Sequence, residues 1–351
     1  MIMNGNIKGL TGLRGFAVLF VILSHSNKAG FRLFDSIDFS GSGRYGVFIF
    51  FVLSSYLLTK QFLDLNEDIN YINYFIKYLI KRILRIYPLF IGALSVYYAL
   101  NQFGYVIWKF DLRDLFLNLL LHDGVGVFWA IPVEFQYYFI IPLVSFVLLK
   151  YKNNFFSVTI LSFSFIILYS YFVKSVYKPN ITPFLAVFYM GSFLAYLQKA
   201  YEGKKFTKRE NLKVKFYLNF ICLLVILCYI IIIPKFYGYI VGRNISIGYF
   251  HHEFYFFGFL SSVLIFTVIN SDGIANKLFS SYFFNFIGNI SFSMYLGHYI
   301  VLAGISKFSH FLFPSISFIL FLLLTTIFSY FSYMFIEKPL YALKHKIIIP
   351  E

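Results

Sequence analysis

The sequence predicts an all-α protein: a polytopic bundle of about ten transmembrane helices, with both termini on the cytoplasmic side. Three observations predict it, namely the composition, the recurrence of long apolar runs and the uneven placement of lysine and arginine. Of 351 residues, 60% are hydrophobic and 13% are charged, whereas soluble domains carry about 25% charged residues. Lipid accepts this much apolar surface, but a water-soluble fold could not bury it. We therefore treat residues 1–351 as a single integral membrane domain.

The apolar runs approach the ~20 residues that a helix needs to cross hydrocarbon. They fall at residues 10–27, 44–62, 84–102, 127–149, 154–173, 181–199, 214–234, 252–270, 285–306 and 314–336. The first run reaches full length without a small-residue cleavage pattern, so we expect a retained anchor rather than a cleaved signal peptide. Cys222 and Cys228 lie inside one run. Two cysteines there favour packing residues over a disulfide framework or a zinc site.

The basic residues predict the orientation. With the N-terminus inside and ten spans, 19 of the 30 lysines and arginines fall in inner segments and 10 in outer ones. The segment from Lys199 to Lys215 alone holds seven. Because positive residues favour the cytoplasmic face, we expect a multi-pass protein of the inner (plasma) membrane. The net charge of +15 then indicates topology and acidic ligands or headgroups rather than nucleic acid.

Two ionisable residues lie within the first run, Arg14 and His25. Their spacing of eleven residues returns them to within about 20° of one helix face, roughly 16 Å apart along the axis. Arg14 is expected near the cytoplasmic side and His25 towards the outer side. Such groups inside a membrane are costly and favour a functional reading. The alternative is that Arg14 reaches lipid headgroups and His25 marks the outer interface.

Glu134 lies in a run expected to cross from outside to inside, a little deeper than Trp129. Its expected depth therefore matches that of His25. A carboxylate beside an imidazole in a dry site orients the ring and raises its basicity. The alternative is a glutamate hydrogen-bonded to backbone at a kink, because Pro132 precedes it by two residues.

Arg82 and Arg85 end a basic stretch at the start of the third run. Paired guanidinium groups suit a phosphate-bearing ligand, but they suit lipid headgroups equally well. The sequence leaves both readings open.

Other histidines carry weaker signals. His298 has Tyr295 one turn before it, and a lone histidine on such a helix is more often a satisfied core residue. His251, His252 and Glu253 form an outer-loop cluster, which we read as solvated loop rather than a metal site. The sequence has no Gly-rich phosphate loop, Walker lysine or GxSxG elbow.

Six stretches in chain order together resemble the membrane acyltransferase-3 family, the bacterial integral membrane O-acyltransferases. They are GLRGFAVLFVILSH, YGVFIFFVLSSYLL, KRILRIYP, FWAIPVEFQYY, NISFSMYLGHYIV and FIEKPL. The resemblance covers essentially the whole chain. It implies transfer of an acyl group, usually acetyl from acetyl-coenzyme A, to a hydroxyl of a surface glycan or glycan precursor.

The resemblance also implies roles for individual residues. Arg14, Arg82 and Arg85 would hold the phosphates of acyl-coenzyme A, a donor co-substrate rather than a tightly bound cofactor. His25 would act as general base on the acceptor hydroxyl, oriented by Glu134. The family's remaining motif residues that would contact the acceptor correspond to Trp129, Tyr295 and His298. We expect direct transfer, because no serine or cysteine stands in a nucleophile motif. We expect no metal site.

The chain departs from the family pattern at three positions. Phe48 stands where the family often has an acidic residue, Ser55 where it often has glycine and Ile300 where it tends to have proline. The first departure bears on the choice of acceptor. Many relatives also carry a C-terminal extracytoplasmic esterase-like domain, and we expect this chain to be the form without one.

Two other functional classes remain open from the residues alone. Buried Arg, Glu and His also describe a transporter of an anionic solute or lipid-linked sugar, although the sequence shows no inverted repeat. The third class is a non-catalytic membrane subunit of a glycan-assembly complex.

Overall fold

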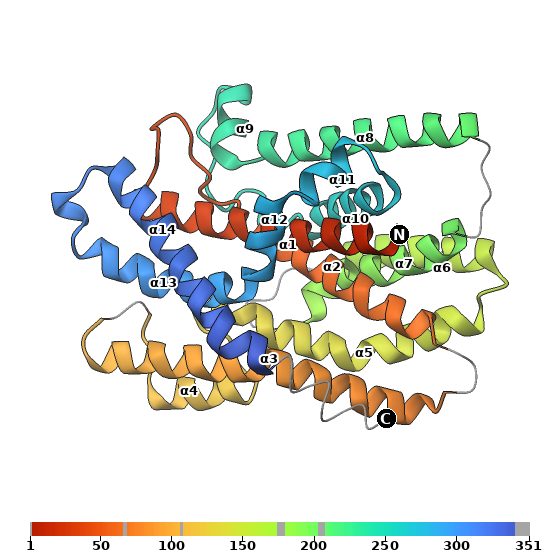
Figure 1. The fold of residues 1–351 in the computed structure, drawn as a ribbon, viewed down its shortest axis with the longest axis horizontal. Coiled ribbons are helices and arrows are strands. Elements are labelled where there is room, and N and C mark those ends of the chain that lie inside the picture. Colours follow the sequence, from red (N-terminus) through yellow and green to blue (C-terminus); the bar gives the residue numbers. More distant parts are fainter. Residues whose placement is uncertain (1, 66–68, 106–107, 174–179, 203–207, 341–351) are drawn as a thin grey trace.

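The computed structural model describes all residues except 1, 66–68, 106–107, 174–179, 203–207 and 341–351. Every regular element among the described residues is helical (Figure 1). The α-helices are α1 (Ile2–Lys28), α2 (Gly43–Leu63), α3 (Tyr71–Gln102), α4 (Leu112–Leu119), α5 (Ala130–Lys150), α6 (Phe155–Phe172), α7 (Leu185–Glu202), α8 (Lys208–Ile231), α9 (Pro234–Val241), α10 (Phe254–Asn270), α11 (Ile274–Phe279), α12 (Tyr282–Asn289), α13 (Ser291–Ser306) and α14 (Pro314–Ser332). Shorter turns are η1 (Gly126–Trp129), η2 (Thr182–Phe184), η3 (Ser309–Phe311) and the π-helical η4 (Tyr333–Glu337).

The predicted all-helical, multi-pass class is confirmed. Among the described residues, seven helices are long and apolar enough to cross a membrane, and α12–α13 would make an eighth if the bent pair is one span. Three of the ten expected runs are not among these seven helices. Run 181–199 corresponds to α7, which is not counted among the candidate spans, and run 252–270 corresponds to α10, a shorter apolar helix of 17 residues. Run 285–306 is bent by 72° between α12 and α13. The count of ten therefore stays a prediction.

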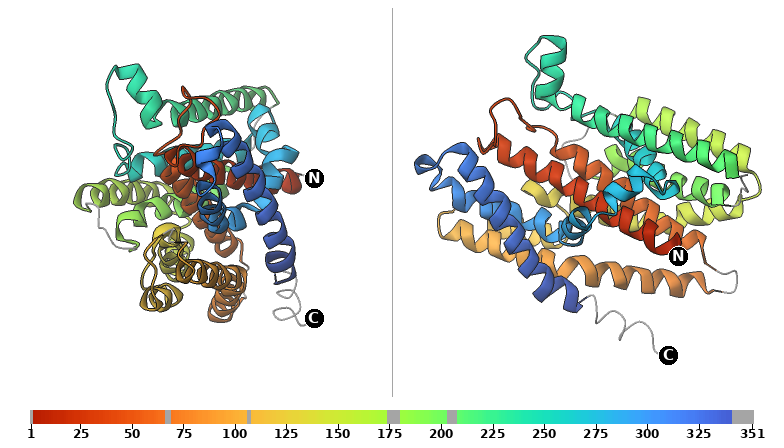
Figure 2. Two further views of the ribbon diagram at one scale, coloured as in Figure 1. Left: turned by 90° about the vertical axis from the view of Figure 1, so that its left-hand side faces the viewer. Right: turned by 45° about the horizontal axis from the view of Figure 1, so that its top comes forward.

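The helices surround a central pair, α1 and α2. Helix α1 packs against α2 and α12, while α2 also packs against α5, α7 and α10. Helices α3 and α4 lie on one side of this pair and α8 lies on the opposite side, in Figure 1 and in the left view of Figure 2. Helices α13 and α14 pack together on a further side. Arg14 and His25 of α1 are thus held inside the bundle, whereas Lys8 and Lys28 near the two ends of the helix are exposed.

Glycines let α1 approach its neighbours closely. A Cβ atom added to Gly12 would lie 1.7 Å from the carbonyl oxygen of Phe279, and one added to Gly288 would lie 1.9 Å from the carbonyl oxygen of Thr11. Small residues at membrane helix interfaces permit this kind of backbone contact. The resulting tight packing fixes α1 relative to α11 and α12.

Local sequence signals account for several helix ends. The side chain of Asn70 accepts hydrogen bonds from the backbone N–H groups of Ile72 and Asn73 and so caps the start of α3. Asp111 and Asp114 form a reciprocal capping box at the start of α4. Gly242, with φ of 65°, ends α9 in the left-handed region that glycine adopts without strain.

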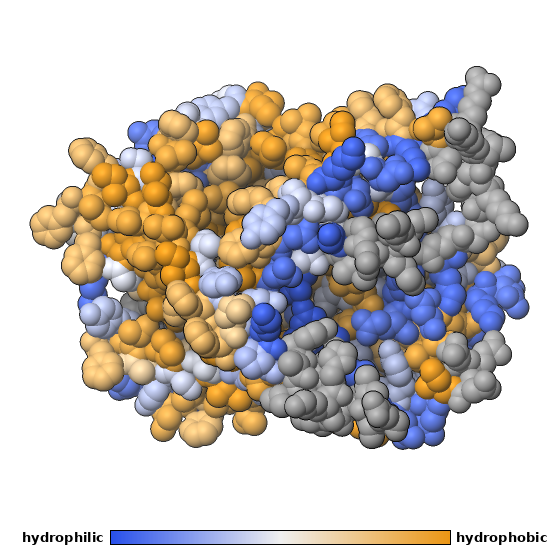
Figure 3. Space-filling view, in the orientation of Figure 1, coloured by the Kyte–Doolittle hydropathy of each residue, from blue (hydrophilic) through white to orange (hydrophobic). Residues whose placement is uncertain are grey.

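The ends of the helices define two faces of the bundle. Helices α2, α5 and α7 end, and α3, α6 and α8 begin, at the right-hand end in Figure 1. In the same orientation, hydrophilic side chains gather towards the centre and right of the visible face, and hydrophobic side chains cover most of its left half (Figure 3). Lys60, Lys150 and Lys199, each in the last turn of one of these helices, therefore share one end of the molecule.

Candidate active site

Two cavities lie along α1 and α2. The first, of about 320 Å³, is lined by basic and acidic side chains and is here called the arginine cavity: Arg14, Ser54, Arg82, Arg85, Glu134 and Tyr138 are among its lining residues. The second, of about 230 Å³, is here called the histidine cavity: His25, Lys28, Arg44, Trp108, Trp129 and Tyr299 are among its lining residues. Val47 and Tyr295 line both cavities. The two spaces thus share a boundary.

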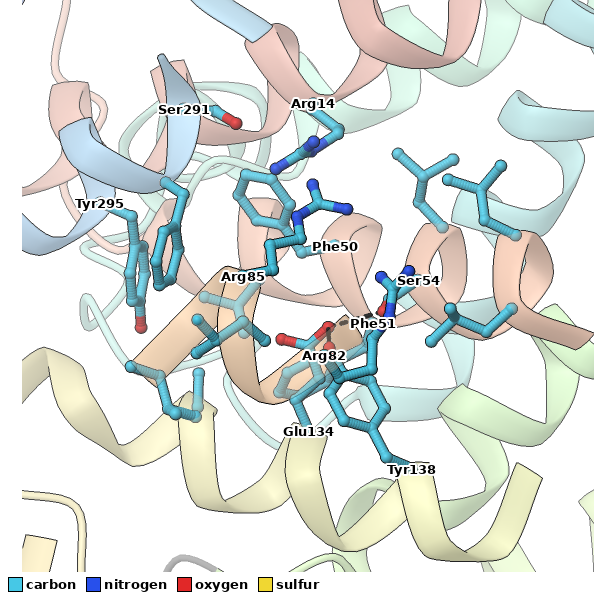
Figure 4. Close-up of a pocket in the computed structure, with 18 of the residues that line it drawn as sticks. Arg14, Phe50, Phe51, Ser54, Arg82, Arg85, Glu134, Tyr138, Ser291 and Tyr295 are labelled. Atoms are coloured by element: carbon cyan, nitrogen blue, oxygen red, sulfur yellow. Dashed lines mark hydrogen bonds between the residues drawn. The ribbon is translucent and has the colours of Figure 1, made fainter. Parts of the chain in front are cut away.

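The structure brings the three predicted arginines into one cavity. Arg14 comes from α1, whereas Arg82 and Arg85 come from one face of α3. Figure 4 shows the guanidinium groups of Arg14 and Arg85 pointing toward each other. Arg82 is only 9% exposed, and its Nε–H has no hydrogen-bond partner among the described residues. A buried donor of this kind is costly unless an anion or acceptor satisfies it.

Glu134 lies in the arginine cavity. Its Oε1 accepts a hydrogen bond of 2.6 Å from the hydroxyl of Ser54 and another of 2.6 Å from the hydroxyl of Tyr138. Figure 4 shows the carboxyl group directed toward Ser54, with the guanidinium of Arg82 beside it. The carboxylate is therefore held among hydroxyl groups and cations.

The predicted pairing of Glu134 with His25 is not formed. A Cβ atom added to Gly43 would lie 3.7 Å from Nε2 of His25, so His25 lies beside the first turn of α2. Ser54, the partner of Glu134, is three turns further along α2, roughly 16 Å away. The sequence placed Trp129 at the end of its span and Glu134 only slightly further in, level with His25. In the structure it is Trp129 that lines the histidine cavity together with His25. Glu134 accordingly lies deeper, close to the level of Arg14.

The partner of His25 is His298. The Nδ1 atom of His25 lies 2.8 Å from Nε2 of His298, and the rings are nearly parallel, at 5°. His298 is fully buried, and its Nδ1 lies 2.9 Å from the carbonyl oxygen of Tyr295 and 3.1 Å from that of Met294. The sequence favoured His298 as a core residue whose hydrogen bonds are satisfied within the bundle. Its contact with His25 makes it a member of the candidate active site as well.

The hydrogen bonds assign the protons of this pair. Carbonyl oxygens only accept, so Nδ1 of neutral His298 carries the proton and its Nε2 is an acceptor. The Nδ1–H of His25 then donates to that Nε2. The lone pair of His25 is thereby placed on its Nε2, beside Gly43 at the wall of the histidine cavity. This is the protonation that a general base needs.

Aromatic rings enclose the histidine cavity. The ring centre of Tyr299 lies 4.8 Å from that of His25 and 4.6 Å from that of Trp108. Trp129 lines the cavity; its role as an acceptor contact stays a prediction. Tyr295 lies at the boundary, where its hydroxyl donates to the carbonyl oxygen of Val127 at 2.6 Å. These rings leave a flat-walled space in front of the imidazole.

The sequence reading missed Glu337. This residue ends the π-helical turn η4, accepts a hydrogen bond from the hydroxyl of Ser293, and interacts electrostatically with Arg14 and Arg85. The sequence did contain a signal for Glu337, because in the FIEKPL stretch it is an acidic residue at the end of an apolar run. Short π-helical turns also recur at functional sites.

His251 corrects a second expectation. Rather than lying in solvated loop, it is half-buried and lines the histidine cavity, with Nε2 3.2 Å from the carbonyl oxygen of Gly41. Among the described residues, no group of three His, Cys, Asp or Glu side chains is placed to hold a metal ion.

Comparison with known proteins identifies the family of this chain. The family model described as an acyltransferase domain (Acyl_transf_3) matches residues 7–334. The chain belongs to this acyltransferase family. The family's match therefore includes every residue placed so far in the two cavities.

Curated relatives of this acyltransferase include three proteins of Staphylococcus aureus. "Putative O-acetyltransferase SACOL0978" of strain COL is 26% identical, covering 95% of this chain and 57% of the relative. "Putative O-acetyltransferase SAS0844" of strain MSSA476 is 26% identical, with 94% and 56% covered. "O-acetyltransferase OatA" of strain NCTC 8325 / PS 47 is 24% identical, with 95% and 57% covered. The chain thus spans little more than half the length of these relatives. No solved structure matches it.

Proposed function

We propose that this protein is a membrane O-acetyltransferase that moves an acetyl group from cytoplasmic acetyl-coenzyme A to a hydroxyl of a glycan outside. One observation carries the proposal: a cavity lined by three arginines adjoins a cavity in which an imidazole presents an unprotonated nitrogen. The names of the relatives, which describe O-acetyltransferases, support the choice of acetyl and of an oxygen acceptor.

The arginine cavity is the donor site in this proposal. The phosphates of coenzyme A accept charge-assisted hydrogen bonds from Arg14, Arg82 and Arg85, and planar guanidinium groups suit such contacts. The unpartnered Nε–H of Arg82 supplies one of these donors. Glu134 lies among the arginines in this cavity, and Glu337 interacts electrostatically with Arg14 and Arg85; both carboxyl groups would help to hold the guanidinium groups in place. The uncharged pantetheine arm passes Val47 and Tyr295 into the histidine cavity.

The chemical step takes place at His25. Nε2 of His25 accepts the proton of the acceptor hydroxyl as its oxygen attacks the thioester carbonyl carbon. The tetrahedral intermediate collapses, the carbon–sulfur bond breaks, and the imidazolium returns its proton to the departing thiolate. The products are the glycan ester and coenzyme A. His298 acts through His25, because its acceptor nitrogen keeps the His25 proton on Nδ1.

The topology that this mechanism needs is testable with reporter fusions. A reporter after Lys205, which lies outside the described residues, is expected to be cytoplasmic, and one near Asp111 is expected to be external. The physical reason is the excess of basic residues in the inner segments. Alkaline phosphatase and fluorescent protein fusions measure this. The reverse pattern would place the donor cavity on the wrong side.

Replacing His298 tests its positioning role. We expect His298→Ala to lower kcat by about 10²-fold, because a misplaced reacting group costs that much, while the KM for acetyl-coenzyme A stays unchanged. His298→Gln, whose side-chain oxygen can accept from Nδ1–H of His25, should recover part of the loss. A positioning role for His298 would be excluded if His298→Ala and His298→Gln were equally inactive. It would also be excluded if the substitutions changed only the KM for acetyl-coenzyme A.

Val47 tests the passage between the cavities. Val47→Trp is expected to block the pantetheine arm and abolish transfer, while coenzyme A still binds through its phosphates. Val47 is itself buried, so retained binding of coenzyme A serves as the check on folding. Val96→Trp, exposed on α3 and outside both cavities, is the control and should transfer as wild type. Normal transfer by Val47→Trp would show that the acetyl group takes another route.

Mass spectrometry of surface glycans tests the function as a whole. Cells that express the protein should carry glycans heavier by one base-labile acyl unit than cells without the gene. An unchanged glycan profile together with altered uptake of an anionic solute would instead identify a transporter.

A further inference from the structure

The histidine cavity carries uncompensated positive charge. Lys28, the last residue of α1, and Arg44, in the first turn of α2, both line it beside His25. None of the residues that line it is an aspartate or glutamate. This contrasts with the arginine cavity, where Glu134 accompanies the cations.

Arg44 is held in place without an acidic partner. Its Nη1 donates to the backbone carbonyl oxygen of His251 at 3.2 Å, and neither Arg44 nor Lys28 forms an ion pair with a described residue. Nearby Arg32, in contrast, lies 3.9 Å from a carboxylate oxygen of Asp38. The guanidinium of Arg44 is therefore anchored at one nitrogen and keeps donors for another ligand.

The charge of the cavity belongs to these two residues. Burial, together with the nearby charges of Arg44 and Lys28, lowers the pKa of His251 to about 4, so its ring is neutral at physiological pH. Its Nε2–H then donates to the carbonyl oxygen of Gly41, which connects the loop before α10 to the loop before α2. Lys28 and Arg44 thus provide two positive charges in the wall of the cavity that also contains His25.

The rest of the cavity suits a sugar ring. Trp108, Trp129 and Tyr299 supply aromatic faces, whose negative potential attracts the C–H groups on the face of a pyranose. A space of about 230 Å³ with aromatic walls, a base and two cations combines the features of a site for a charged saccharide.

We propose that the acceptor is an anionic glycan whose phosphate or carboxylate group binds Lys28 and Arg44 while its hydroxyl faces Nε2 of His25. This inference rests on the proposed function and specifies the acceptor class for it. Charge-assisted hydrogen bonds to a guanidinium and an ammonium would fix the register of the sugar, and hence which hydroxyl is acylated.

The first test compares variants of the full chain in nanodiscs with acetyl-coenzyme A. The acceptor probe is the glycan fraction extracted from cells that express the protein, after mild base has removed its esters. Arg44→Gln and Lys28→Gln are each expected to raise the KM for this acceptor about tenfold, as the loss of one charged hydrogen bond implies. The KM for acetyl-coenzyme A should not change. Arg32→Gln, a matched control whose side chain pairs with Asp38, should behave as wild type.

The second test changes the glycan instead of the protein. Carbodiimide coupling to methylamine neutralises carboxylates, and hydrogen fluoride removes phosphodiesters, so the treatment that abolishes acceptor activity identifies the anion. A neutral glycan that is acylated as well as the native one would overturn this inference and leave the acetyltransferase intact. The inference would also be overturned if Arg44→Gln and Lys28→Gln weakened binding of the protein to anionic vesicles but left the KM for the acceptor unchanged. Absence of any acylated glycan with the wild-type protein would instead reject the proposed function.

Discussion

His25→Ala is expected to reduce the kcat of acetyl transfer by about 10²–10⁴-fold, the usual contribution of a general base. The binding of acetyl-coenzyme A should persist, because His25 does not line the donor cavity and Arg14 lies about three helical turns from it along α1. Turnover measured with the purified protein, together with donor binding in the same detergent, separates the two effects.

Two further variants sharpen this prediction. His25→Gln keeps a polar side chain but offers no nitrogen that accepts the proton, so it should be almost as inactive as His25→Ala. Glu134→Gln keeps its contacts with Ser54 and Tyr138 in large part and does not touch His25, so its effect should fall on donor affinity. Substantial transfer by His25→Ala would mean that the proton acceptor lies elsewhere.

Arg14→Ala and Arg85→Ala are each expected to weaken the binding of acetyl-coenzyme A by about ten- to a hundredfold. Each removes a charged hydrogen bond worth roughly 1.5–3 kcal/mol, and each 1.4 kcal/mol corresponds to about tenfold in affinity. Isothermal titration calorimetry measures the change. Lys77→Ala is the matched control, because Lys77 is an exposed cation on α3 that does not line the cavity. If both arginine variants bind the donor as tightly as wild type, these side chains serve only as lipid anchors.

The sequence predicted best what depends on short stretches of chain. Apolar length identifies membrane helices because lipid requires each backbone polar group to be satisfied within its own segment. Arg82 and Arg85 lie one turn apart on α3, so their shared face was readable from spacing. Their meeting with Arg14 was an expectation from family resemblance, and the structure brings the three into one cavity.

What the sequence could not predict depends on how helices are rotated and staggered against each other. The position of Glu134 was misjudged because Trp129 at the end of η1 lines the same cavity as His25, so that Glu134, more than one helical turn further along the chain, lies beyond the level of His25. The contact between His25 and His298 joins residues 273 positions apart, and no local pattern encodes it. The bend between α12 and α13 falls at Gly288 and Asn289, two poor helix formers, but the sequence did not show that Gly288 there contacts Thr11 of α1 or that the bend reaches 72°.

The central claim is that the acetyl group passes from a donor on one face to an acceptor on the other by way of His25. Vesicles containing uniformly oriented protein test it most directly, with acetyl-labelled coenzyme A supplied at one face and ester-free glycan at the other. Labelled glycan is expected only when the donor is at the face where α2 ends and α3 begins, and only with His25 intact. Equal labelling from either face, or labelling by His25→Ala, would contradict the account.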